Sequence, residues 1–480
     1  MASRIIAPYF GNSIYVWGSL IGVFLAALAA GYFLGGRLAD RWPSPAVFSG
    51  LVFCAGALVF PIPLIGSRIL ESIALADFGP RSNPLAASLA LFFLPGVVMG
   101  MVSPFAVRLR ARTVATIGNV AGVLYALSTV GSIVGTLLAA FVLIALMGVR
   151  TIVHLLGALL MALAVIGWLS GRRPGIAGAA TLVAGLLVLG VPLAGSPVSD
   201  GLQFERDTVY HRITVSDEGS VRYLKLDNYW QSALDLTDGR RTVFAYSDYL
   251  HLPVLFRPQA NRVLVIGLGG GTVPTRYHQD YPAMVIDVVE LDPAVVGVAL
   301  RHFGLPQDGR MRVATEDGRL FLTRSGERYD MILLDAYLID TIPFHLATRE
   351  FLETARARLA PSGVVASNVI GALEGPRSAL FRALYKTFRV VFRTVYVFPV
   401  EWRRYDSPQT LRNIIIIGTD QPALSPHAII EAARVRTQPG VTLERYEEAA
   451  RDLYTARISI DGVPVLTDDY APVELLIQRR

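Results

Sequence analysis

The first 200 residues of this 480-residue chain are almost wholly apolar, and this feature limits the possible folds more than any other. A helix needs about 20 apolar residues to cross the hydrocarbon core of a bilayer. Buried core helices of a soluble protein are the alternative, but many in succession would leave no polar face for water. The sequence therefore predicts a multi-pass transmembrane helical bundle over residues 1–198, placed in a lipid bilayer. Its six expected spans are 14–36, 45–66, 85–107, 119–147, 151–169 and 176–195.

Small residues recur along the fourth of these segments. Glycines stand at positions 118, 122, 131 and 135. Since small residues let helix backbones approach closely in lipid, we expect this helix to pack tightly against its neighbours.

Charge is divided unevenly between the two halves of the chain. Residues 1–200 hold 11 Arg, no Lys and 4 Asp or Glu, whereas residues 201–480 hold 33 Lys or Arg and 34 Asp or Glu. The net charge of +6 thus comes from arginines between apolar segments, which excludes a nucleic-acid partner. The single cysteine, Cys54, lies in an apolar run, and the 7 histidines form no ligand-spaced pair. We therefore expect neither an internal disulfide nor a metal site.

The arginines also predict an orientation, because cytoplasmic loops are enriched in them. The loops on one side carry more arginines than the loops on the other, and they are called the richer set. If the richer set lies on the cytoplasmic side of the cell inner membrane, six spans would place both termini and the soluble half outside the cytoplasm. That side conflicts with the cytoplasmic supply of nucleoside cofactors. A second hypothesis is that 176–195 does not span, which would make the soluble half cytoplasmic. The richer set is Arg37, Arg41, Arg108, Arg110, Arg112, Arg172 and Arg173, and the opposite set is Arg4, Arg68, Arg81 and Arg150, diluted by Glu71 and Asp77.

The soluble half centres on a strand that ends in a glycine-rich loop. Residues 263–266 are aliphatic and mostly β-branched, and four glycines fall within positions 267–271. Glycine lets the chain turn sharply and lets backbone N–H groups approach a ligand. A second apolar strand, 285–289, is followed by Glu290, the place where an acid normally holds a nucleotide ribose. These features predict a nucleoside-binding α/β domain.

Strands and helices alternate through the rest of the chain. Further strands are expected at 311–315, 329–334, 363–368, 394–398 and 413–418, with helices at 293–303, 348–359 and 376–388. The alternation predicts a parallel, doubly wound, Rossmann-like sheet over 259–480. Gly267, Glu290, Asp317 and Asp335 would all lie at carboxyl ends of strands, where ligands bind in such sheets. One acid there is often a helix cap, but four positions in register favour a site.

A smaller subdomain is expected over 199–258, before the glycine loop. Residues 204–236 alternate in strand fashion, with turns at 218–219 and 227–228, so they predict a small antiparallel β-hairpin unit. Residues 242–255 are expected to form a linking helix, with Pro253 near its end.

These motifs resemble a known family. The order of a glycine-rich loop, a ribose acid, Asp317-Gly318 and Asp335 is similar to that of class I S-adenosylmethionine-type domains. The stretch 229–232 (Tyr-Trp-Gln-Ser) and the 246–253 helix resemble the spermidine synthase (polyamine aminopropyltransferase) family. Segments 7–11, 35–41 and 466–472 (Leu-Thr-Asp-Asp-Tyr-Ala-Pro) resemble its branch with a fused membrane domain. In that branch related chains carry one more helix before Arg4, so we expect this start to be truncated.

The resemblance implies a nucleoside pocket with named contacts. Glu290 would accept the ribose hydroxyls, Asp317 would accept from the adenine amino group, and Gln231 would lie near the cofactor. The remaining cofactor-binding positions are the glycines Gly267, Gly269, Gly271 and Gly318, together with Asp335. The implied cofactor is decarboxylated S-adenosylmethionine or S-adenosylmethionine, without a metal.

The resemblance also implies a catalytic pair, Asp335 and Tyr246. An amine must be neutral to attack a sulfonium, so a nearby base is required, and Asp335 would accept its proton or orient it. The residues expected near the amine or polyamine substrate are Asp248, His251 and Tyr337. A purely structural role is an open alternative for Tyr246 and for Gln231.

Two positions depart from the family pattern. The acid that contacts the aminopropyl nitrogen in the family is replaced by Gly270, and a second acid, expected to grip the polyamine, is replaced by Leu338. Asp340 or Asp248 could substitute. Uncompensated charge in a partly buried site is costly, so the departures weaken the expectation of a diamine.

Three hypotheses about function follow. The first is a membrane-bound aminopropyltransferase of polyamine biosynthesis. The second is an enzyme that uses intact S-adenosylmethionine, as a methyltransferase, lyase or cyclase. The third is a non-enzymatic nucleoside or polyamine sensor or transporter, suggested by the loop 36–41. A homo-oligomer formed through the soluble domain is an additional hypothesis.

Overall fold

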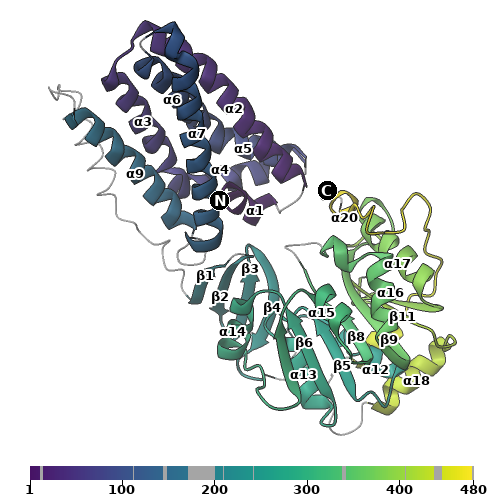
Figure 1. Ribbon diagram of the computed structural model, residues 1–480. Helices are drawn as coiled ribbons and strands as arrows, with labels where there is room; N and C mark the ends of the chain where they lie inside the picture. The colour runs from purple at the N-terminus through teal and green to yellow at the C-terminus, as the bar shows by residue number, and fades with distance from the viewer. Residues whose placement is uncertain are drawn as a thin grey trace. The chain divides into compact units, whose positions relative to one another are not determined.

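The computed structural model describes the chain except residues 11–13, 80, 112, 144–148, 171–200, 209, 240, 242, 338–341, 406, 437–445 and 478–480. The chain divides into two compact units. One comprises Met1–Asp200 with Arg206–His211, and the other comprises Gly201–Glu205 with Arg212–Arg480. Figure 1 labels the helices and strands of both.

The first unit is helical. Four helices in its described part are long and apolar enough to cross a membrane, or five if one bent pair counts as a single span. The expected span at 176–195 lies outside the described residues. The elements are α1 (Ala2–Phe10), α2 (Ile14–Arg41), α3 (Pro45–Val59), α4 (Ile62–Ala76), α5 (Ser82–Ser88), the π-helical η1 (Leu89–Phe93), α6 (Leu94–Arg110), α7 (Val114–Leu138), the π-helical η2 (Ala139–Leu143) and α9 (Val149–Ser170).

The second expected span, 45–66, is not one straight helix. Helices α3 and α4 meet at an angle of 54°. Pro61 lies at the break, and proline has no N–H to continue the helical hydrogen bonds while its ring clashes with the preceding turn. The segment predicted to span at 45–66 is therefore broken at Pro61, and it counts as a span only if α3 and α4 are taken together.

Close helix packing involves other glycines than those expected. The positions of Gly118 and Gly131 on α7 have open space around them. By contrast, a Cβ at Gly35 would lie 2.6 Å from the Cα of Met101, so α2 and α6 touch backbone to backbone. Helices α3 and α9 approach in the same way at Gly56. The prediction of tight packing along the fourth segment was wrong, and the small-residue contacts lie between α2 and α6 and between α3 and α9.

The arginine-rich ends of α2 and α6 lie together. Arg108 Nε is 2.9 Å from Asp40 Oδ1 across these two helix ends. Two groups of arginines that the sequence assigns to one side thus share one end of the helical unit.

The second unit begins with a four-stranded antiparallel sheet in the order β1-β2-β3-β4. The predicted hairpin turns are present, with Gly219 and Asp227 at positive φ. The buried face of this sheet packs Ile213 and Leu224 against Val295 and Phe303 of the following domain. The strands are β1 (Leu202–Asp207), β2 (Arg212–Glu218), β3 (Val221–Leu226) and β4 (Tyr229–Asp235).

The predicted helix over 242–255 is instead two single turns, α11 (Tyr246–Tyr249) and α12 (Pro253–Phe256). Between them the Leu252 N–H donates to the Tyr249 carbonyl, three residues back along the chain. This is the hydrogen bond of a 3₁₀ turn, whereas an α-helix bonds four residues back. Leu252, before the proline, keeps helical dihedral angles, but Pro253 has no N–H to donate to the Tyr249 carbonyl. The proline therefore breaks the helix instead of ending it.

The large sheet has seven strands in the order β10-β11-β9-β8-β5-β6-β7 (Figure 1). Strands β5 to β9 run parallel to their neighbours, whereas β11 is antiparallel to both β9 and β10. The fully parallel sheet was wrong for this edge, because the chain after β10 returns directly as a hairpin. The strands are β5 (Arg262–Ile266), β6 (Val285–Glu290), β7 (Met311–Thr315), β8 (Tyr329–Leu334), β9 (Leu359–Gly371), β10 (Thr394–Pro399) and β11 (Arg412–Thr419).

Alternate residues of these strands enter two separate cores, one on each face. Val263 and Val265 face the core with α11, α12, α13, α18 and α19, while Leu264 and Ile266 face the core with α15, α16 and α17. This is the doubly wound arrangement that the sequence predicts. The helices are α13 (Thr272–Asp280), α14 (Pro293–His302), α15 (Gly318–Arg324), α16 (Arg349–Ala357), α17 (Ala379–Val391), α18 (Pro426–Arg436), α19 (Tyr446–Arg451) and α20 (Val473–Leu476), with short 3₁₀ turns η3 (Phe344–Leu346) and η4 (Pro376–Ser378).

Candidate active site

The glycine loop joins β5 to α13 and needs its glycines. Gly267, Gly269 and Gly271 all have positive φ, a conformation that other residues rarely adopt. The Gly267 N–H donates to the Val289 carbonyl at 2.9 Å, and a Cβ at Gly267 would clash with the Asp335 carbonyl. The loop therefore lies directly against the ends of β6 and β8.

Gly270, where the family pattern has an acid, is enclosed by neighbours. Its N–H donates to Ser232 Oγ at 2.8 Å. A Cβ at Gly270 would lie 2.8 Å from Ser232 Cβ and 2.9 Å from a ring carbon of Phe303. No larger side chain fits unless these residues move, so the packing of the hairpin sheet accounts for the missing acid.

Glu290 and Asp317 follow neighbouring strands, as predicted, and each already serves its own loop. Glu290 accepts from the Leu268 N–H at 3.0 Å and thereby braces the glycine loop. Asp317 caps α15 by accepting from two backbone N–H groups, and its other oxygen accepts from His345 Nε2 at 3.0 Å. Gly318 packs against Ile266 of β5 so closely that a Cβ would clash. Carboxylate oxygens can accept further hydrogen bonds, so these contacts are compatible with a ligand role.

A cavity of about 850 Å³ lies between the hairpin unit and the carboxyl ends of β5, β8 and β9. It brings together five residues that the sequence predicts for the site: Asp335, Tyr246, Gln231, Tyr337 and Gly269. Its other walls come from residues that the sequence did not indicate. These include Tyr229, Trp230, Ser232, Phe244, Leu268, Asn368, Ile370, Val400, Glu401, Arg404, Tyr405, Leu411, Arg412 and Asn413.

Asp335 is one of the two carboxyl groups in the described wall of this cavity, and Glu401 is the other. Its burial raises its pKa from the ordinary 3.8 to about 7, although Asn368, which donates to Oδ1 at 2.9 Å, opposes the rise. A carboxyl with this pKa exchanges a proton near neutral pH, which is what a general base requires.

Two asparagines that the sequence analysis missed hold Asp335. Asn413 donates to the Asn368 side-chain oxygen at 3.0 Å, and this orients the Asn368 amide so that its nitrogen faces Asp335. Tyr337 donates to the Asn368 carbonyl at 3.0 Å. Asn368 closes the predicted strand 363–368, so a buried polar residue at that strand end was the available signal.

Tyr246 lies close to Asp335 and stays protonated. Burial and the negative charge of Asp335 raise the pKa of its phenol well above the ordinary 10.0. Its hydroxyl donates to the Gln231 carbonyl at 3.3 Å. Tyr246 can therefore donate hydrogen bonds at this site but cannot act as a base near neutral pH.

Asp248 and His251, predicted as substrate residues, do not reach this cavity. They line a second cavity of about 500 Å³, beside Arg276 of α13. His251 is 1% exposed and stacks on Tyr277, with 4.2 Å between ring centroids, and burial together with Arg276 lowers its pKa to about 3. The break at Pro253 directs this turn toward α13 rather than toward Asp335. Leu338 and Asp340 lie outside the described residues.

Comparison with known proteins gives a consistent family. Residues 243–409 match the spermine/spermidine synthase domain. The polyamine aminopropyltransferase of Vibrio vulnificus is 35% identical over 247 residues, which cover 49% of this chain and 77% of that protein. The eEF1A lysine and N-terminal methyltransferase of Bos taurus is 33% identical over 150 residues, covering 29% of this chain and 21% of that protein. The crystal structure of spermidine synthase from Thermotoga maritima is 19% identical with a TM-score of 0.42, covering 54% of this chain and 85% of that one.

Proposed function

The chain belongs to the spermine/spermidine synthase family and is a transferase of the aminopropyltransferase kind, and we propose that it transfers an aminopropyl group from decarboxylated S-adenosylmethionine to an amine at the Asp335 cavity. The observation that carries this proposal is the position of Asp335. Its carboxyl has a pKa of about 7 and lies in one cavity with Tyr246, Gln231 and the glycine loop. Such a group is suited to take a proton from an attacking amine.

The residues of the glycine loop fit a nucleoside substrate. Gly269 lies in the cavity wall with positive φ, and Gly267 leaves no room for a Cβ, so the backbone itself forms this surface. Glu290 would accept hydrogen bonds from the ribose hydroxyls, and Asp317 would accept a hydrogen bond from the adenine amino group. Decarboxylated S-adenosylmethionine supplies the aminopropyl carbon, whose bond to sulfur breaks with both electrons remaining on the neutral thioether.

Asp335 would remove the proton that the amine releases. Above pH 7 its carboxylate accepts this proton as the nitrogen–carbon bond forms, which leaves the product amine neutral at that nitrogen. Asn368 holds the carboxylate in place, and Tyr246, whose phenol stays protonated, would not compete with Asp335 for the proton. Apolar and aromatic residues of the hairpin unit would limit the access of water.

Transfer and binding measurements on the purified full chain test this function. With decarboxylated S-adenosylmethionine and a series of amines, we expect methylthioadenosine release that depends on the amine and disappears in Asp335→Asn. Calorimetric titration should give tighter binding of the decarboxylated compound than of S-adenosylmethionine. Equal or tighter binding of the carboxylated compound would refute the aminopropyl donor.

A second candidate is an enzyme that uses intact S-adenosylmethionine. Two observations favour it. Gly270 removes an acid that would repel a substrate carboxylate, and the cationic residues Arg404 and Arg412 lie in the cavity wall. The bovine relative is also, by its name, a methyltransferase. The same titration decides between the two candidates, since only this one requires binding of the carboxylated cofactor.

We further propose that the helical unit anchors the enzyme in the inner membrane. The four or five long apolar helices support this, and the salt bridge between Arg108 and Asp40 gathers the arginine-rich helix ends that would face the cytoplasm. Reporter fusions at positions 199 and 480 test the side of the soluble half. With Arg4 on the non-cytoplasmic side, a cytoplasmic reporter at both positions would mean that an odd number of segments span.

A further inference from the structure

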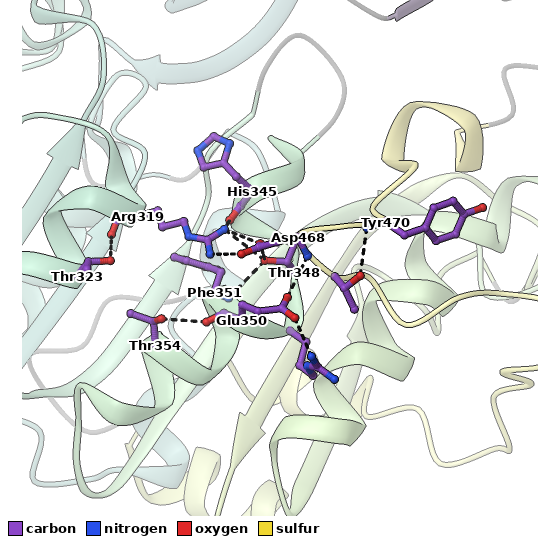
Figure 2. Close-up of polar contacts among 11 residues, drawn as sticks. Arg319, Thr323, His345, Thr348, Glu350, Phe351, Thr354, Asp468 and Tyr470 are labelled. Atoms are coloured by element: carbon purple, nitrogen blue, oxygen red, sulfur yellow. Dashed lines mark hydrogen bonds and ion pairs between the residues drawn. The ribbon is translucent and has the colours of Figure 1, made fainter.

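The segment Thr467–Pro472, one of the motifs that resemble the fused branch, is anchored by one carboxylate. Asp468 accepts two parallel hydrogen bonds from the Arg319 guanidinium, at 2.7 Å from Nη1 and 2.6 Å from Nη2 (Figure 2). Paired bonds between arginine and a carboxylate fix both distance and orientation. The segment is therefore held at a defined place on α15, the helix that Asp317 caps.

The same carboxylate also binds the beginning of α16. Thr348 Oγ1 donates to Asp468 Oδ1 at 2.7 Å while it accepts from the Phe351 N–H as the cap of α16. The Asp468 N–H donates to Glu350 Oε2 at 3.0 Å. Figure 2 shows these contacts, by which Asp468 joins Arg319 of α15 to Thr348 and Glu350 at the beginning of α16.

A chain of contacts leads from Asp468 to the nucleoside end of the site. Arg319 Nη1 donates to the His345 carbonyl at 3.1 Å, and His345 Nε2 lies 3.0 Å from Asp317 Oδ2. Arg319 also follows Asp317 by two residues, and its N–H is bound by the Asp317 cap. Both the backbone and the side chain around Asp317 are thus held by groups that Asp468 orients.

We propose that Asp468 is a positioning residue that, through Arg319 and His345, sets the Asp317 carboxylate for contact with the adenine group. The proposal rests on the proposed function insofar as Asp317 meets the nucleoside. Without the charge on Asp468, Arg319 would lose its paired acceptor and could turn toward the nearest carboxylate. His345 and Asp317 would then lose their fixed separation, while Asp335, at another strand end, would keep its Asn368 contact.

The test compares two neighbouring substitutions in the full chain. Asp468→Asn keeps the size of the side chain but removes the charge that pairs with Arg319. Asp469→Asn makes the same chemical change at the next residue; both residues are exposed, but the paired bonds from Arg319 go to Asp468. Binding of methylthioadenosine by calorimetry, KM for the nucleoside substrate, kcat, and the thermal unfolding midpoint are measured for both.

For Asp468→Asn we expect Kd for methylthioadenosine and KM for the nucleoside substrate to rise roughly fivefold or more, with kcat at saturation and KM for the amine close to those of Asp469→Asn. Asp468→Glu should recover part of the affinity, because it restores the charge. An unchanged Kd in Asp468→Asn would overturn the proposal. So would a fall in kcat and unfolding midpoint without a change in Kd, since that pattern indicates a structural clamp alone.

The binding measurement separates this proposal from the proposed function. If the wild-type chain binds methylthioadenosine but transfers no aminopropyl group, the reaction is wrong while the positioning role can still be measured. If the wild-type chain binds no nucleoside, both fail together, and the unfolding midpoint then shows whether the protein was intact.

Discussion

Replacing Asp335 with asparagine should make the protein more stable and inactive at the same time. The shape of the side chain is kept, and an oxygen remains to accept from Asn368. The pKa of the native carboxyl is raised from 3.8 to about 7 by burial, and at about 1.4 kcal/mol per pH unit this corresponds to roughly 4 kcal/mol. Since the carboxyl keeps partial contact with the cavity, solvent reduces this figure, and we expect a gain of about 1–2 kcal/mol.

The sign of the effect depends on pH in a defined way. Above pH 7 the carboxyl is ionised in both the folded and the unfolded chain, so the full cost of burying the charge is present and the variant gains most. As pH falls from 7 toward 4, the folded state takes up a proton that the unfolded state does not, and the gain shrinks.

Thermal unfolding of the full chain in detergent, followed by tryptophan fluorescence, measures the gain. At pH 8 we expect the midpoint of Asp335→Asn to rise by about 2–5 °C over wild type, with a smaller rise at pH 5 and none in Asp469→Asn. Transfer should fall by about a hundredfold or more, as for loss of a general base. A midpoint equal to or below wild type at pH 8 would refute the burial argument, and retained transfer would refute the base.

Three further substitutions test the neighbourhood of Asp335. Asn368→Ala removes a donor that lowers the Asp335 pKa, so the rise of kcat/KM near pH 7 should move to higher pH by about half a unit to one unit, as a pH–rate profile will show. Gly267→Ala forces a side chain into positive φ against the Asp335 carbonyl, so unfolding free energy should fall by about 2 kcal/mol or more in denaturant titration. Gly270→Asp meets Phe303 and should lower the unfolding midpoint without improving binding of decarboxylated S-adenosylmethionine; tighter binding would contradict the packing argument.

The sequence predicts most strand ends of the large sheet to within one residue, because β-branched runs and the glycine loop are local signals; the exception is β9, which was predicted at 363–368 and extends over Leu359–Gly371. It does not predict the order of the strands in the sheet, which decides which side chains lie next to each other at the site. Leu334 pairs with Ser367 in neighbouring parallel strands, so the next residues, Asp335 and Asn368, come to lie opposite each other. This pairing depends on which strands are neighbours in the sheet. It cannot be predicted from the spacing of residues along the chain.

Helix continuity was the second limit of the sequence. Apolar periodicity continues through Pro61 and through Pro253, and both segments were predicted as single helices. In each case the missing N–H and the ring clash outweigh the pattern and divide the helix. The consequence for the site is large at Pro253, because His251, in the segment between the two turns, lines the second cavity and not the cavity of Asp335.

The missing acid at Gly270 and the raised pKa of Asp335 together determine how the site meets a cation. Ser232 and Phe303 occupy the space that an acidic side chain at Gly270 would need. The carboxylates in the described wall of the cavity are then Asp335 and Glu401, and Glu401 is paired with Arg404 at 2.9 Å. Below pH 7 Asp335 is protonated and contributes no negative charge. The affinity for a cationic amine should therefore fall with the same titration that removes the base, so that binding and proton transfer are lost together as pH decreases.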